Sequence, residues 1–224
     1  MHTLSKFNNN PSTQHYKGAI RTVKYLSGTQ DTHILTYKAS GEPLNKFVIN
    51  GQVIFAPRLH VSVYCDADWA GDQTDRKSTT GYVVRINNNT VSWSSRKQTT
   101  TSLSSAEAEY MAIASAAQEA IWIRQFLTEF FHLSLDINNL YSCNIYSDNT
   151  SAIQIAKHDV SHDRTKHIDI RYHFIRDYLQ DGWFNLVWIP TDLQIADMFT
   201  KALPINRFEK LATAVLSPFH SLDT

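Results

Sequence analysis

The chain has 224 residues, 42% of them hydrophobic, which is enough for one sizeable core with some surplus length. Its 21 lysines and arginines balance 21 aspartates and glutamates, so a strongly basic surface over the whole molecule is excluded and any grip on nucleic acid must be local. Two isolated cysteines, no apolar N-terminal segment and no apolar run of about 18 residues argue against a disulfide scaffold, a zinc module, a signal peptide and a membrane-spanning helix.

The first part of the chain predicts one amphipathic helix and a few short strands. Residues 12–27 have helical periodicity, and Lys17, Arg21 and Lys24 fall on one face. This basic face is either a solvated surface or a track for phosphates, and the sequence leaves both interpretations open. Residues 29–57 then show short strand patterns, with an Asn-Gly pair that is typical of a hairpin turn.

From residue 59 onward the pattern changes to an ordered series of strands and helices. Three alternating segments joined by short turns predict an antiparallel meander. These segments span 60–69, 79–86 and 90–97. A long alanine-rich helix is predicted next at about 105–131, and Ser104 with Glu107 forms a capping box at its start.

The remaining elements are two strands and three helices. The strands are predicted at 139–149 and 183–190, and the helices at 150–158, 167–182 and 193–203. Thr191 and Gln194 offer a second capping box, ahead of the last helix. The order of three strands, helix, strand, helices, strand and helix predicts an α/β fold with a mixed five-stranded sheet flanked by helices.

Four acidic residues lie where this order of elements would gather them. Asp66 is near the end of the first strand, Glu109 in the first turns of the long helix, Asp148 at the end of the fourth strand, and Asp197 in the last helix. Clustered carboxylates repel one another at neutral pH, and bound divalent cations usually offset this repulsion. Two Mg²⁺ ions would suit this site and would support in-line cleavage of a phosphodiester. Each acid taken alone also fits a structural role as a turn residue, a helix cap or a helix-dipole partner.

Two further acids lie beside these four in the sequence. Glu107 is two residues from Glu109, a rotation of about 200° on a helix, so both cannot face one metal site. The capping box gives Glu107 a structural role, which leaves Glu109 as the ligand. Asp68 shares a strand face with Asp66, so it is a candidate to assist or substitute at the metal.

Six blocks of the sequence resemble the ribonuclease H region of copia-type retrotransposon Pol polyproteins, in that family's order. They are YCDADWAGD, DRKSTTGYV, SSAEAEYMA, IYSDNTSAI, RTKHIDIRYHFIRD and IADMFTKALP. The resemblance covers nearly the whole chain. It implies a ribonuclease H-like fold and hydrolysis of RNA paired to DNA, with Mg²⁺ as the cofactor and Mn²⁺ as a substitute. The four acidic metal-binding positions of the family correspond to Asp66, Glu109, Asp148 and Asp197.

The resemblance also implies how the chain is organised. Residues 1–57 resemble the end of the reverse transcriptase and the connection segment, 58–204 the ribonuclease H domain, and 205–224 a C-terminal helix and tail. No Tyr-x-Asp-Asp polymerase motif occurs in the sequence. We therefore expect the polymerase centre, the integrase and the protease to lie outside this chain, which would make it a fragment or a degenerate copy of an element.

Polar and basic residues around the expected acidic site are candidates for substrate contacts. A nuclease that ignores sequence grips a hybrid mainly through phosphates and 2′-hydroxyl groups. The candidates are Arg76, Lys77, Ser78, Thr79, Thr80, Arg96, Lys97, Gln98, Asn149 and Ser151. Each of them fits a solvated loop at least as well. His167, in the second long helix, is favoured as an anchor of that helix over a role at the site.

Three functions compete for this sequence. The first is an active endonuclease that acts on RNA/DNA hybrids. Its expected partner is the reverse transcriptase portion of the parent polyprotein. Its expected location is the cytoplasm, within a virus-like particle, or the nucleus, with no association with a membrane. The second is a non-catalytic remnant or co-opted nucleic-acid-binding module with the same fold. The third, an integrase or transposase, requires its glutamate after both aspartates, whereas Glu109 lies between Asp66 and Asp148. The intact acids favour the first function, whereas the missing polymerase, which would supply much of the contact with the hybrid, favours the second.

Overall fold

The computed structural model divides the chain into two compact units, Met1–Leu35 and Thr36–Thr224. The residues that it describes are 4, 7–29, 45–49, 52–56, 58–130, 141–157 and 174–216. Within these ranges no helix combines the length and the apolar composition that crossing a membrane requires. The boundaries expected at residues 57 and 204 stay predictions.

The first unit consists mainly of the helix α2, Thr13–Thr29, which confirms the predicted helix. Lys17, Arg21 and Lys24 line one shallow pocket on this helix together with Tyr16 and Ile20, so the basic residues do share a face. No residue of α2 is buried.

A small hairpin forms at the start of the second unit. Strands β1 (Asn45–Ile49) and β2 (Gln52–Ala56) pair antiparallel, with Ile49 opposite Gln52. A two-residue connection of this kind is what an Asn-Gly pair favours. The predicted hairpin is therefore confirmed.

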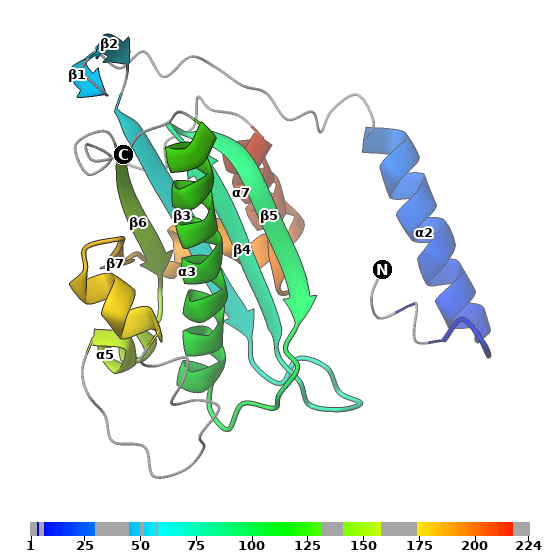
Figure 1. Cartoon of the computed structure of the whole chain (residues 1–224). Helices are drawn as coiled ribbons and strands as arrows, with labels where there is room; N and C mark the ends of the chain where they lie inside the picture. Colours follow the sequence, from blue (N-terminus) through cyan, green and yellow to red (C-terminus); the bar gives the residue numbers. More distant parts are fainter. Residues whose placement is uncertain are drawn as a thin grey trace. The chain divides into compact units, whose positions relative to one another are not determined.

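A mixed five-stranded sheet forms the centre of the second unit, with the strand order β5-β4-β3-β6-β7 (Figure 1). The strands are β3 (Leu59–Asp68), β4 (Thr79–Ile86), β5 (Asn89–Lys97), β6 (Tyr141–Ser147) and β7 (Asn185–Trp188). The first three form an antiparallel meander, whereas β6 runs parallel to β3 and β7 parallel to β6. The expected α/β fold with a mixed five-stranded sheet is confirmed.

The tight turn between β4 and β5 depends on two asparagines. Asn87 and Asn88 have φ angles of 47° and 66°, and Ile86 pairs with Asn89 across the turn. Two consecutive residues with positive φ suit the right-handed twist of a two-residue hairpin, and asparagine tolerates this conformation better than most residues. The turn predicted between these strands is thus explained by its residue types.

Helices cover the two faces of the sheet (Figure 1). The helix α3, Ser105–Phe130, packs one side against β3 and β4, where small residues such as Ala112 and Ala116 allow a close approach. The short helix α5, Thr150–Lys157, packs against α3. On the other face, α7 (Ile205–Leu216) buries Leu211 and Val215 against Val83.

The segment predicted as one helix at 193–203 has a different structure. It forms two short 3₁₀ helices, η1 (Thr191–Leu193) and η2 (Ile195–Phe199), and the residue that caps the start of η1 is Pro190, not Thr191. The fully buried amide of Gln194 accepts a hydrogen bond from the Ala196 N–H and donates one to the Cys65 carbonyl at 2.9 Å. The second capping box was therefore wrong, because this side chain ties the segment to β3 instead.

Part of the second long helix predicted at 167–182 can be checked. Residues 174–180 are helical, whereas the N-terminal part of the prediction lies outside the described residues. The role proposed for His167 also falls outside them and stays a prediction.

The close approach of η2 to the sheet requires a glycine on β4. Gly81 pairs with Asp66 of β3, and a Cβ atom at this position would lie 2.7 Å from Thr200 Cγ2 and 2.8 Å from Phe199 Cβ. Real Cβ atoms do not approach other atoms this closely, so any larger residue would push η2 away.

Gly81→Ala is therefore expected to lower the free energy of unfolding by about 1–3 kcal/mol, measured by urea titration with circular dichroism. The control is Gly28→Ala, because a Cβ there meets no atom within 4 Å. An unchanged unfolding midpoint in Gly81→Ala would show that η2 does not press against this strand.

Candidate metal centre

Three carboxylates converge at one edge of the sheet. Asp66 lies near the end of β3, Asp148 directly follows β6, and Glu109 lies in the first turns of α3. Because β3 and β6 are parallel neighbours, both strands end at the same edge, where α3 begins. One oxygen from each of these three residues lies within 4.8 Å of the others. The structure thus brings together three of the four acids selected from the sequence.

The environment of these carboxylates suits a divalent cation. Asp66 and Glu109 are only 1% and 7% exposed, and Glu109 Oε2 is buried with no hydrogen-bond partner among the residues that the structure describes. Burial, together with the charges of Asp66 and Asp148, raises the pKa of Glu109 to about 9. Burial and these same three carboxylates also raise the pKa of the adjacent Cys65 thiol. A cation with oxygen ligands would relieve this concentration of negative charge.

The fourth acid, Asp197, has a different environment. It lies in η2, is fully buried, and forms ion pairs with two cations. Lys201 Nζ lies 2.8 Å from Asp197 Oδ1, and the guanidinium of Arg207 contacts Asp197 Oδ2. Asp197 therefore lies next to the three-residue cluster with both of its oxygens already facing positive groups.

Two residues connect Asp197 to Asp66. Lys201 Nζ lies 3.4 Å from Asp66 Oδ2, and the Thr200 hydroxyl donates a hydrogen bond to the same carboxylate. Burial alone would lower the pKa of Lys201, but its hydrogen bond to Asp197 and the charges of both aspartates raise it. Lys201 is therefore a stable ammonium at the edge of the cluster.

Of the two neighbouring acids, Glu107 has the structural role that the sequence predicted, and Asp68 lies outside the three-residue cluster. The Ser104 Oγ accepts a hydrogen bond from the Glu107 N–H, and the Glu107 carboxylate accepts one from the Leu103 N–H, which confirms a structural cap. Asp68 is half-buried near the end of β3 and is not one of the three clustered acids, and burial raises its pKa. Its assisting role stays a prediction.

Several residues proposed to contact substrate make contacts within the protein. Lys97 forms ion pairs with Asp72 and Asp75 at 2.5 and 2.6 Å. The Lys77 ammonium donates to the Thr99 carbonyl at 2.7 Å. The Ser78 hydroxyl is fully buried and accepts a hydrogen bond from the Ala70 N–H. These contacts brace the loop between β3 and β4 against the end of β5.

The proposed substrate residues around α5 and on β4 are also partly structural. Asn149 caps α5, because its side chain accepts a hydrogen bond from the Ala152 N–H at 2.9 Å. The buried Gln98 amide donates to the Thr80 hydroxyl and to the Ala108 carbonyl. Ser151 is exposed in the first turn of α5, and Thr79 is half-buried at the start of β4.

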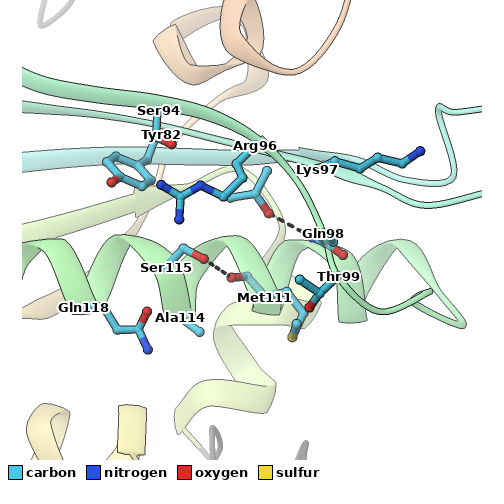
Figure 2. Close-up of a pocket in the computed structure, with 11 residues that line it drawn as sticks. Tyr82, Ser94, Arg96, Lys97, Gln98, Thr99, Met111, Ala114, Ser115 and Gln118 are labelled. Carbon is cyan, nitrogen blue, oxygen red and sulfur yellow. Dashed lines mark hydrogen bonds between the residues drawn. The ribbon is translucent and has the colours of Figure 1, made fainter. Parts of the chain in front are cut away.

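Arg76 and Arg96 are the exposed cations of the proposed set. Figure 2 shows Arg96 in a pocket of about 200 Å³ between β5 and α3, with its guanidinium near Tyr82 and Ser115. Lys97 extends in the opposite direction (Figure 2). The lining of the pocket includes Met111, which is two residues from Glu109, so this pocket and the acidic cluster lie on different sides of α3.

Sequence reasoning missed the residues that surround Asp197. Thr200 and Lys201 belong to the block IADMFTKALP, and the spacing of four residues between Asp197 and Lys201 was an available signal. Nothing in the sequence pattern pointed to Arg207, which reaches this site from α7.

Two exposed tryptophans near the cluster were also missed. The indole N–H of Trp69 donates to the Ser102 carbonyl, and the indole N–H of Trp188 donates to the Asp148 carbonyl.

The sequence is similar to those of known proteins over nearly the whole length of the chain. The retrovirus-related Pol polyprotein from transposon RE1 of Arabidopsis thaliana is 36% identical over 212 residues, 95% of this chain and 13% of that protein. The Pol polyprotein from transposon TNT 1-94 of Nicotiana tabacum is 36% identical over 206 residues, 92% of this chain and 14% of that protein. The chain belongs to the copia-type transposon Pol polyprotein family. It spans only about 13% of the length of these Pol polyproteins.

Solved structures similar to this Pol segment include ribonucleases. LC11-RNase H1 in complex with an RNA/DNA hybrid has a TM-score of 0.43 and 16% identity, and the match covers 62% of this chain and 93% of that chain. RNase H1 from the archaeon Halobacterium salinarum has a TM-score of 0.41 and 14% identity, over 64% of this chain and 94% of that chain. No protein-family model matches the sequence.

The raised pKa of Glu109 predicts how stability depends on pH in EDTA. Its pKa is about 9 in the folded protein and 4.5 in an unfolded chain, so the folded state binds the extra proton between these values. Stability should therefore fall as pH rises through this window. Glu109→Gln should weaken this dependence and raise stability at the alkaline end by at least about 1 kcal/mol, because each pKa unit corresponds to about 1.4 kcal/mol.

Thermal melts across this pH window would measure the effect. The exposed Glu209 of α7 provides the matched control Glu209→Gln. If the wild type and Glu109→Gln lost stability in parallel as pH rises, Glu109 would not be the group that binds the proton.

Proposed function

We propose that the second unit of this chain is an endonuclease that hydrolyses the RNA strand of RNA/DNA hybrids during reverse transcription of a retrotransposon. The observation that carries the proposal is the convergence of Asp66, Glu109 and Asp148 at one edge of a mixed sheet. Membership of the transposon Pol polyprotein family supports it, because reverse transcription produces such hybrids.

We propose that the acidic cluster binds Mg²⁺, with Mn²⁺ as a substitute. Carboxylate oxygens are the ligands that Mg²⁺ prefers, and it readily completes its coordination with water and substrate phosphates. When bound as a pair, divalent cations can generate a nucleophile from water and stabilise the leaving oxygen of a phosphodiester. Asp66, Glu109 and Asp148 supply the buried ligands, and Asp197 is proposed as the fourth.

The protein's own residues provide the rest of the reaction site. The hydrogen bond from Thr200 and the ammonium of Lys201 orient the Asp66 carboxylate. The Asn149 cap fixes the start of α5 directly after Asp148. The clustered acids are therefore preorganised on the ends of rigid elements, which is the arrangement that a precise cleavage site needs.

We propose that the hybrid is contacted through its backbone, chiefly by the exposed Arg76 and Arg96, together with Thr79 and Ser151. The partner expected in the parent polyprotein is its reverse transcriptase portion. The proposed location is the cytoplasm, within a virus-like particle, or the nucleus.

Cleavage of a labelled RNA/DNA hybrid in Mg²⁺ is the direct test of this function. The wild-type chain should cut the RNA strand, whereas Asp148→Asn should cut it at least about 100-fold more slowly, because the metal site loses a charged ligand. The matched control is Asp181→Asn, since Asp181 is exposed in a turn outside the acidic cluster.

Each outcome of the cleavage assay has a defined meaning. Equal cleavage by wild type and Asp148→Asn would refute the site assignment. Binding of the hybrid without cleavage by the wild type would support the alternative function, a non-catalytic nucleic-acid-binding module with this fold.

The proposed contact of Arg96 with the substrate predicts a salt-dependent effect. Arg96→Ala should weaken hybrid binding to a similar extent for unrelated sequences and reduce the slope of log affinity against log salt by about 1, measured by fluorescence anisotropy. The control is Lys210→Ala, since Lys210 is exposed on α7. An unchanged slope in Arg96→Ala would remove Arg96 from the substrate contacts.

A further inference from the structure

Lys201 is placed between two buried carboxylates of the acidic site. Its ammonium lies 2.8 Å from Asp197 Oδ1 and 3.4 Å from Asp66 Oδ2. The two carboxylates are 0% and 2% exposed, whereas the lysine side chain is 35% exposed. A positive charge therefore bridges the two acids from the side that is open to solvent.

The backbone around Lys201 fixes the base of this side chain. The N–H groups of Thr200 and Lys201 both donate to the Asp197 carbonyl at 3.2 Å, which closes the end of η2. The Thr200 hydroxyl donates to Asp66, and the absence of a side chain at Gly81 lets this turn lie against β4. The ammonium is thus directed toward the site by several contacts.

Arg207 completes the set of internal cations. Its guanidinium contacts Asp197 Oδ2 and also donates to the Thr191 carbonyl at 2.8 Å. A guanidinium with two fixed acceptors is a rigid partner, whereas a lysine has a flexible stem and a compact charge. Of the two cations, Lys201 is the one that can leave its acids without disrupting the backbone around it.

The charges at this site are only half balanced by these two cations. Asp66, Glu109, Asp148 and Asp197 supply four negative charges when all are ionised, and Lys201 with Arg207 supplies two positive ones. The remaining charge matches one divalent cation. A second divalent cation that used Asp66 and Asp197 would meet the ammonium of Lys201 at the same oxygens.

We propose that Lys201 is a built-in counter-ion that makes the site bind its two divalent cations unequally. The first cation binds at Asp66, Glu109 and Asp148. The second binds more weakly, because it has to displace the Lys201 ammonium from Asp66 and Asp197. Lys201 is in this sense a positioning residue, and the inference rests on the proposed metal-dependent function.

Calorimetric titration of the EDTA-stripped chain with Mn²⁺, without nucleic acid, tests this inference. The wild type should show one tighter and one weaker binding step. Lys201→Gln should tighten the weaker step by at least about tenfold, because a positive charge within about 4 Å is removed. Lys201→Arg, which keeps the charge, should leave that step weak, and Lys210→Gln on the exposed side of α7 should change neither step.

A second measurement on the wild type avoids any dependence on the folding of a variant. Nitrogen-15 NMR of lysine ammonium groups during titration with Mg²⁺ should show the Lys201 signal shifting with the second equivalent of metal and not with the first. A shift with the first equivalent, or no shift at all, would overturn the inference.

The possible failures can be told apart. Equal Mn²⁺ affinities in wild type and in folded Lys201→Gln, with hybrid cleavage by the wild type, would overturn the counter-ion role and leave the proposed function standing. A wild type that binds no Mn²⁺ and cleaves no hybrid would overturn both.

Discussion

Mutual repulsion among buried carboxylates is the constraint on which the rest of this site depends. Parallel pairing of β3 and β6 forces Asp66 and Asp148 to the same sheet edge, and α3 adds Glu109. Burial and the repulsion from Asp66 and Asp148 raise the pKa of Glu109 to about 9. Such an arrangement is stable only when protons, internal cations or bound metal ions offset the negative charge.

The second unit meets this constraint with its own C-terminal residues. The buried Gln194 ties the chain to β3, so that Asp197 of η2 and the following Thr200 and Lys201 lie at the acidic edge. From α7, Arg207 adds a second positive charge. Residues far from β3 in the sequence are therefore part of the electrostatic balance of the acidic cluster.

Contacts within the protein also limit which of the proposed residues can contact a substrate. Lys77, Lys97 and Ser78 use their polar atoms to brace the loop after β3. Arg76 and Arg96 are the exposed residues among the four cations proposed to contact the substrate. We propose that these two arginines let a chain without net charge bind phosphates locally.

The sequence by itself determined the elements whose signals are local. Period-two alternation predicted the strands, and the Ser104–Glu107 cap predicted the start of α3. The order of these elements was also enough to predict that the acids on β3, α3 and β6 would meet. The parallel pairing of β3 and β6, which brings both strand ends to one edge, was seen only in the structure.

Only the tertiary structure decided the surroundings of Asp197. The periodicity of 193–203 predicted one helix, but the buried side chain of Gln194 bonds to β3 and the segment becomes two 3₁₀ turns. The partners of Asp197 depend on how closely η2 packs on Gly81 and on where α7 places Arg207. These are long-range packing contacts, and a local sequence pattern does not encode which distant side chain fills a given space.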